Sequence, residues 1–138
     1  MNAYKFKDLY TGFNEKFSVA ITEEMMDKFL AISQDDNPLH TDIEFAKNKG
    51  FKDKVAYGML VACFYSRLVG VYLPGKYCLL QGIEISFNNP VFVGDLLSVS
   101  GEISYINQAY KQIEIKARIV NQENKKVSTA KIKVGINE

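Results

Sequence analysis

Hydrophobic and polar residues alternate along five stretches of the chain. An apolar side chain at every second position is the pattern of a strand with one buried face, so each stretch is predicted to be a strand. The apolar positions are Phe17, Val19 and Ile21; Ile83, Ile85 and Phe87; Leu97, Val99 and Ile103; Ile113, Ile115, Ala117 and Ile119; and Ala130, Ile132 and Val134. Short turns at Gly94-Asp95, Asn107-Gln108 and Asn121 to Lys125 favour an antiparallel meander for the last four strands.

Two helices are predicted between the first strand and the others. The first begins after Thr22, a favourable N-cap followed by acidic residues, and its apolar residues recur at helical spacing. It should end near Ser33, because Asn37-Pro38 does not allow a regular helix to continue. A second, short helix is expected over Ile43 to Asn48 and ends before Gly50.

The stretch from Gly58 to Leu73 is apolar on nearly every side. A helix of this kind must be buried all round. In so small a domain, only a sheet curled about the helix, helped by a partner subunit, can bury it. We therefore predict an α+β fold in which an antiparallel sheet wraps around a central buried helix.

Length and composition fit one globular domain over residues 1–138, with 47% hydrophobic and 24% charged residues. A net charge of +1 argues against binding to nucleic acid. No secretory signal or membrane span is recognisable, and Cys63 and Cys78 form neither a disulfide framework nor part of a zinc motif. We expect a cytoplasmic protein with reduced thiols, no membrane association, and no metal or other cofactor.

Polar residues crowd the segment from Ser33 to Asp42, which holds the only histidine, His40, and three carboxylates. Histidine is the side chain best suited to moving protons near neutral pH. A chain that turns at Asn37-Pro38 could bring Asp35 and His40 onto one water molecule. The alternative is that the segment is a loop that ends a helix, since Asp, Asn, Pro and Ser are common in loops. A Ser-His-Asp triad is disfavoured because no G-x-S-x-G motif is present.

The run from Ser33 to His40, Ser-Gln-Asp-Asp-Asn-Pro-Leu-His, resembles the signature of the MaoC-like (R)-specific enoyl-CoA hydratases. Three further segments are similar to that family: Tyr57 to Leu60 at the start of the apolar helix, Leu73 to Gly75 at its end, and Asn89 to Asp95. The similarity extends from about Phe17 to Val134. Two departures are visible, because Gln34 stands where the family usually has glycine and Tyr57 stands where it commonly has histidine.

The resemblance implies a hotdog fold and a homodimer, or a higher homo-oligomer, with substrate tunnels at or near the subunit interface. It also implies the reversible addition of water to a trans-2-enoyl thioester, giving the (R)-3-hydroxyacyl thioester. The substrate would be carried on coenzyme A or on an acyl carrier protein.

Asp35 and His40 would be the catalytic residues, holding and deprotonating one water molecule. Asn37 would orient the loop or the substrate. The backbone N–H of Gly58, at the start of the apolar helix, would meet the developing oxyanion, although Gly58 could simply be a helix-entry residue. Ser66 matches a polar position that faces the active site in the family, or is a core hydroxyl bonded to the backbone.

Two other functions are compatible with the fold. A hotdog acyl-CoA thioesterase usually uses a carboxylate on or beside the central helix, and Gly58 to Leu73 contains no Asp or Glu. A non-catalytic acyl-thioester-binding protein would not need the pair of Asp35 and His40. Both features favour the hydratase.

Overall fold

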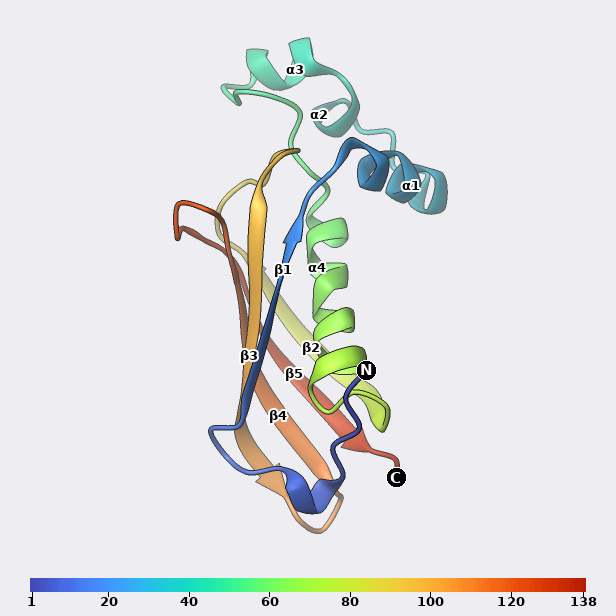
Figure 1. The fold of residues 1–138 in the computed structure, drawn as a ribbon. Helices are drawn as coiled ribbons and strands as arrows, with labels where there is room; N and C mark the ends of the chain where they lie inside the picture. Colours follow the sequence, from blue (N-terminus) through green and yellow to red (C-terminus); the bar gives the residue numbers. More distant parts are fainter.

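A five-stranded antiparallel sheet curves around one helix in the computed structural model, which describes residues 1–138 (Figure 1). The elements are η1 (Phe6–Asp8), β1 (Asn14–Ala20), α1 (Glu23–Ser33), α2 (Pro38–Thr41), α3 (Ile43–Asn48), α4 (Gly58–Arg67), η2 (Leu68–Tyr72), β2 (Cys78–Phe87), β3 (Leu96–Asn107), β4 (Gln112–Val120) and β5 (Lys126–Ile136). The predicted α+β architecture, with a sheet wrapped on a central helix, is confirmed.

The strand order β1-β3-β4-β5-β2 differs in one respect from the predicted meander. Strands β3, β4 and β5 follow one another through the predicted turns, but β2 pairs with β5 and not with β3. Strand β1 occupies the free edge of β3 instead, with Phe17 opposite Val99. The expectation of four consecutive meander strands was therefore wrong for β2, which takes the opposite edge of the sheet.

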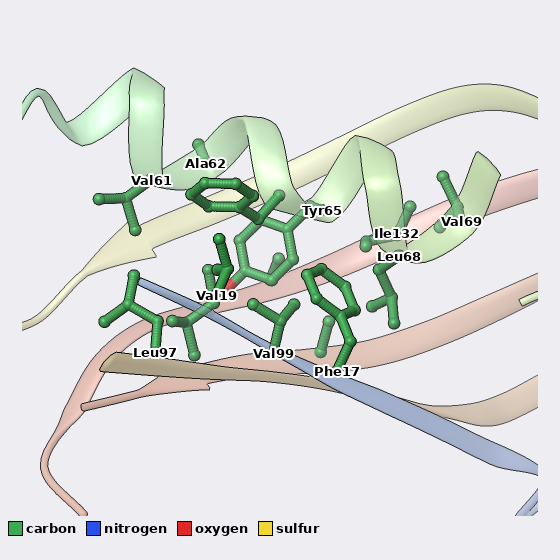
Figure 2. Packing of buried hydrophobic residues seen from close by; sticks show 14 of the residues in the cluster. Phe17, Val19, Val61, Ala62, Tyr65, Leu68, Val69, Leu97, Val99 and Ile132 are labelled. Carbon is green, nitrogen blue, oxygen red and sulfur yellow. The ribbon is translucent and has the colours of Figure 1, made fainter. Parts of the chain in front are cut away.

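The alternating residues of β1, β3, β4 and β5 form the core against α4. Figure 2 shows Val61, Tyr65 and Leu68 pointing toward Val19, Leu97 and Val99 on the sheet. The sheet comes very close to the helix at Gly101, where an added β-carbon would lie 2.8 Å from Leu68 Cδ2. Only glycine allows the two layers to approach this closely without a shift.

Within one chain the central helix is not buried on every side, and the partner subunit expected to help bury it stays a prediction. Met59, Cys63, Ser66 and Arg67 are exposed, and their spacing places them on one face of α4. The sheet covers one side of the helix only, so the opposite face has no cover within the chain. The regular α-helix ends at Arg67, and the chain continues to Tyr72 as the π-helical turn η2.

The short helices α1, α2 and α3 lie together at the end of the sheet where α4 begins (Figure 1). Thr22 caps α1 as predicted, since its hydroxyl oxygen accepts a hydrogen bond from the N–H of Met25 at 3.2 Å. No helix of the chain is long and apolar enough to cross a bilayer. The arrangement brings the segment between α1 and α2 to the N-terminal end of α4.

Candidate active site

Three of the predicted site residues line one cavity of about 300 Å³ at the start of α4. Asp35 follows α1, His40 lies on α2, and Gly58 is the first residue of α4. The full lining is Phe29, Ser33, Asp35, His40, Tyr57, Gly58, Met59 and Phe87. The turn at Asn37-Pro38 brings the carboxylate and the imidazole together, and the packing of α4 adds a helix N-terminus to the same cavity.

A second cavity of about 320 Å³ adjoins the first, because His40, Gly58 and Phe87 line both. Its other walls are mostly apolar and come from α4, from the segment before it, from the region between β2 and β3, and from β5. These residues are Phe51, Val55, Ala56, Val61, Asn88, Asn89, Pro90, Val91 and Val127. An apolar cavity therefore adjoins the cavity that holds Asp35, and His40 lines both.

The imidazole of His40 is held in a defined orientation. Its Nδ1 lies 2.7 Å from the carbonyl oxygen of Val55. A carbonyl oxygen can only accept, so Nδ1 carries a proton and donates it. In the neutral ring, Nε2 is then the basic nitrogen, and this nitrogen is not used by any hydrogen bond within the chain.

Asp35 lies in a short irregular segment between two helices. Helix α1 ends at Gln34, which has the left-handed backbone conformation (φ 57°, ψ 23°). This conformation favours glycine, the residue that the resemblance leads one to expect here, and Gln34 adopts it all the same. The Asp35 side chain is exposed, and its Oδ1 accepts a hydrogen bond from the N–H of Asn37 at 3.2 Å.

The segment from Ser33 to Asp42 is not wholly irregular, since it contains the single-turn helix α2. Asn37 caps this turn, and its Oδ1 accepts a hydrogen bond from the N–H of Leu39 at 2.9 Å. Pro38 occupies the first turn, where its missing N–H is not needed. Asn37 lines neither cavity, and its role in orienting the loop or the substrate stays a prediction.

Ser66 is not brought to the cavities within the chain. It lies on the exposed face of α4, two turns beyond Gly58, and is absent from the lining of both cavities. Its side chain makes no hydrogen bond to the backbone, so it is also not a buried core hydroxyl. A role for Ser66 at the site stays a prediction.

The backbone N–H of Gly58 has no acceptor within the chain. It lies in the first turn of α4, where N–H groups have no partner inside a helix and where the helix dipole favours negative charge. A β-carbon on Gly58 would lie 3.3 Å from the ring of Phe87. Glycine therefore leaves this N–H accessible beside an aromatic wall.

Two residues of the site were not identified as such from the sequence. Phe87 was predicted only as a strand residue, yet it lines both cavities. Tyr57 was noted only as a departure from the family pattern, and it contacts both Asp35 and His40. Both contacts depend on long-range folding, so no local pattern could have indicated them.

Residues 9–128 match the model of the family described as MaoC like domain, which is most of the chain. The chain belongs to the MaoC-like family. Over 94 residues, this MaoC-like chain is 38% identical to the (R)-specific enoyl-CoA hydratase of Aeromonas caviae, a match that covers 68% of the chain and 70% of the relative. Hydratases and dehydratases are hydro-lyases, and this chain is one of them.

Solved structures agree with the family assignment. The unliganded R-hydratase PhaJ1 of Pseudomonas aeruginosa is 28% identical, with a TM-score of 0.91 over 97% of this chain and 86% of that one. The (R)-hydratase of A. caviae, whose structure is described as involved in PHA biosynthesis, is 32% identical, with a TM-score of 0.90 over 94% and 98% of the two chains. The predicted hotdog fold is confirmed.

Proposed function

We propose that this MaoC-like protein adds water reversibly to a trans-2-enoyl thioester and forms the (R)-3-hydroxyacyl thioester. The observation that carries the proposal is the single cavity lined by Asp35, His40 and Gly58. Hydration needs a base for the water molecule and a group that stabilises the enolate oxygen, and this cavity holds both. The A. caviae relative is named for this reaction.

His40 acts as the base that activates the water. Because Nδ1 donates to the carbonyl of Val55, the free Nε2 can take a proton from the water as its oxygen bonds to C3. The bond between C2 and C3 loses its π electrons to the thioester, which becomes an enolate. The imidazolium then returns the proton to C2, and His40 is neutral again at the end of the cycle.

Asp35 holds the same water molecule from the other side. One of its oxygens accepts from the N–H of Asn37, and the second oxygen has no partner in the chain. A carboxylate in this place can accept a hydrogen bond from the other O–H of the water and favours the transient positive charge on His40. The pair therefore works as a unit on one water molecule.

Gly58 stabilises the enolate. Its N–H is free, and it lies at the positive end of the α4 dipole. A donor of this kind is typically worth a factor of about 10² to 10³ in turnover. The acyl chain then fits the adjoining apolar cavity, with coenzyme A or an acyl carrier protein attached through the thioester outside it.

The active unit is a homodimer or higher homo-oligomer. Strand β2 is an edge strand with one unpaired side, and all its residues except Cys78 and Ile85 are exposed. Leu80, Ile83 and Phe87 lie uncovered on the face that the core shares. Since Phe87 also lines both cavities, a second copy over β2 would complete the walls of the site.

The two thiols fit a reducing compartment, and we place the protein in the cytoplasm. Cys63 and Cys78 are both unpaired. Neighbouring protein atoms partly desolvate each thiol, that of Cys63 in spite of its exposed position, and raise the pKa of both, that of Cys78 to about 11. Cysteines held as neutral thiols are slow to form disulfides.

Two assays on the same protein test the reaction. Crotonyl-CoA should be hydrated, with loss of the enoyl thioester absorbance and formation of the (R)-3-hydroxy product on chiral analysis. A thiol reagent should detect no release of coenzyme A in the same reaction. Thiol release without hydration would instead identify a thioesterase, and binding without either reaction would identify a non-catalytic binder.

A further inference from the structure

Tyr57 contacts both proposed catalytic residues with one side chain. Its ring lies against the imidazole of His40, with 4.2 Å between the ring centroids and 33° between the planes. Its hydroxyl donates a hydrogen bond to the backbone oxygen of Asp35 at 2.8 Å. The side chain is almost fully buried, with 2% of the residue exposed. One buried aromatic residue therefore connects the segment of Asp35 with the ring of His40.

We propose that Tyr57 is a positioning residue that fixes Asp35 and His40 relative to each other; this rests on the proposed roles of those two residues. The backbone at Asp35 belongs to the irregular segment between α1 and α2. Tyr57 ties this segment to the start of α4, which is packed on the sheet. This contact fixes the position of the Asp35 carboxylate relative to the His40 imidazole.

The imidazole of His40 is fixed by two contacts from the same short segment. Val55 accepts the hydrogen bond from Nδ1, and Tyr57, two residues later, covers one face of the ring. Together they set the orientation of the imidazole, which lines both cavities. The ring of Tyr57 is itself supported by Phe29 of α1, at 4.7 Å between centroids.

The hydroxyl of Tyr57 stays protonated over the working pH range. Burial, together with the negative charges of Asp35 and Asp36, raises its pKa above the ordinary value for tyrosine. It is therefore a permanent donor to the backbone of Asp35.

The test compares Tyr57→Phe, which keeps the ring, with Tyr57→Leu, which loses both contacts. Loss of the hydroxyl should lower kcat by about 5- to 10-fold, the effect of one lost hydrogen bond, while KM changes by less than about 2-fold. Tyr57→Leu should lower kcat by about 10²-fold, since small displacements of catalytic groups are costly. A kcat of Tyr57→Phe equal to that of the wild type, or a rise in KM alone, would overturn the proposal.

Tyr65→Phe is the matched control. Tyr65 is also a buried tyrosine with a hydrogen-bonded hydroxyl, but it lines neither cavity. Its loss should lower the melting temperature and leave kcat unchanged. If Tyr65→Phe reduced kcat as much as Tyr57→Phe, the effect would be one of general stability and the positioning role would be wrong.

A spectroscopic measurement separates this inference from the proposed function. His40 is the only histidine, so the imidazole nitrogen resonances in an NMR spectrum report on it alone. The wild type and Tyr57→Phe should show one sharp set with Nδ1 protonated, and Tyr57→Leu should show a broadened or mixed tautomer pattern. An unchanged pattern in Tyr57→Leu refutes the positioning of His40, even if the wild type proves not to be a hydratase.

Discussion

At the residue scale, Asp35 and His40 are expected to be equally indispensable. Each of Asp35→Asn and His40→Gln should lower the rate of hydration by at least about 10²-fold, because each removes one of the two groups that grip the water. Both substitutions are close in shape, and Asp35 is exposed while His40 is only half-buried, so packing should change little. Steady-state hydration of crotonyl-CoA measures the loss, and circular dichroism checks the fold.

The double variant Asp35→Asn with His40→Gln distinguishes a shared water from independent action. If both side chains hold one water molecule, the double variant should be little slower than either single variant. Fully additive losses would show that the two residues act on different steps. Wild-type rates in both single variants would show that the segment from Ser33 to Asp42 is only a loop that ends a helix and has no catalytic role.

The backbone of Gly58 can be tested without changing a functional side chain. Gly58→Pro removes the N–H and should lower turnover by about 10²- to 10³-fold. Proline is tolerated in the first helical turn, and the ψ of Tyr57 (127°) already lies in the range that a residue before proline prefers. The measurement is kcat for the folded variant.

Gly58→Ala is the control for crowding beside Phe87. It keeps the N–H but places a β-carbon 3.3 Å from the Phe87 ring, so it reproduces the crowding without removing the donor. Its turnover should exceed that of Gly58→Pro by at least about 10-fold. Equal losses in the two variants would mean that crowding, and not the missing donor, impairs the enzyme.

The sequence was informative about the site wherever a residue's role depends on its neighbours along the chain. Asp35 and His40 were predicted to share a site because a turn at Asn37-Pro38 separates them, and both line the same cavity. The cap that Asn37 provides to α2 was not predicted in this form. The bridge from Tyr57 to Asp35 spans 22 positions, so it depends on the packing of α4 against α1.

At the element scale, a short chain of hydrogen bonds joins the central helix to two strands. The hydroxyl of Tyr65 on α4 donates to Ser128 Oγ on β5 at 2.9 Å, and Ser128 donates to the backbone oxygen of Ser86 on β2 at 2.9 Å. Burial raises the pKa of Tyr65 to about 12, so its hydroxyl remains a donor at neutral pH. These two hydrogen bonds connect the edge strand β2, through β5, to the helix α4.

Ser128 lies between the other two residues of this series of hydrogen bonds, and removal of its hydroxyl should lower the stability most. Ser128→Ala leaves the buried Tyr65 hydroxyl and the Ser86 carbonyl without this partner, and should lower the free energy of unfolding by about 1–3 kcal/mol. Tyr65→Phe removes only the terminal donor and should cost about 1 kcal/mol. Urea denaturation measures both values. Adding Tyr65→Phe to Ser128→Ala should recover part of the loss, and purely additive costs would contradict this account.

The hydrophobic pattern predicted where the strands lie in the sequence better than it predicted which strands pair. Alternation correctly indicated the strands around Val99, Ile115 and Ile132, because each has one side on the core. The same alternation in β2 gave no sign that Ile83 would be uncovered, since a strand at an edge and a strand in the middle share one pattern. Which strand pairs with which is decided by long-range packing.

At the scale of the whole molecule, the uncovered faces of β2 and α4 predict a dimer. Light scattering at micromolar concentration should give about twice 15.6 kDa. Ile83→Lys places a charge on the exposed apolar side of β2 and should shift the protein toward the monomer.

Tyr110→Lys is the control for that experiment. Tyr110 is more exposed than Ile83, at 75% against 39%, but lies in the turn between β3 and β4 and not on β2 itself. Its substitution should leave the dimer intact. A wild-type monomer, or equal dissociation of the two variants, would argue against β2 as the interface.

The position of β5 has a consequence for how the protein is made. β5 is the last strand to leave the ribosome, yet it lies between β4 and β2 in the finished sheet. β2 therefore emerges long before its only partner within the chain, and its apolar side chains stay open to chaperones or to aggregation while synthesis continues. The sheet is complete only when β5 inserts between β4 and β2, so the pairing of segments distant in sequence limits the rate of folding.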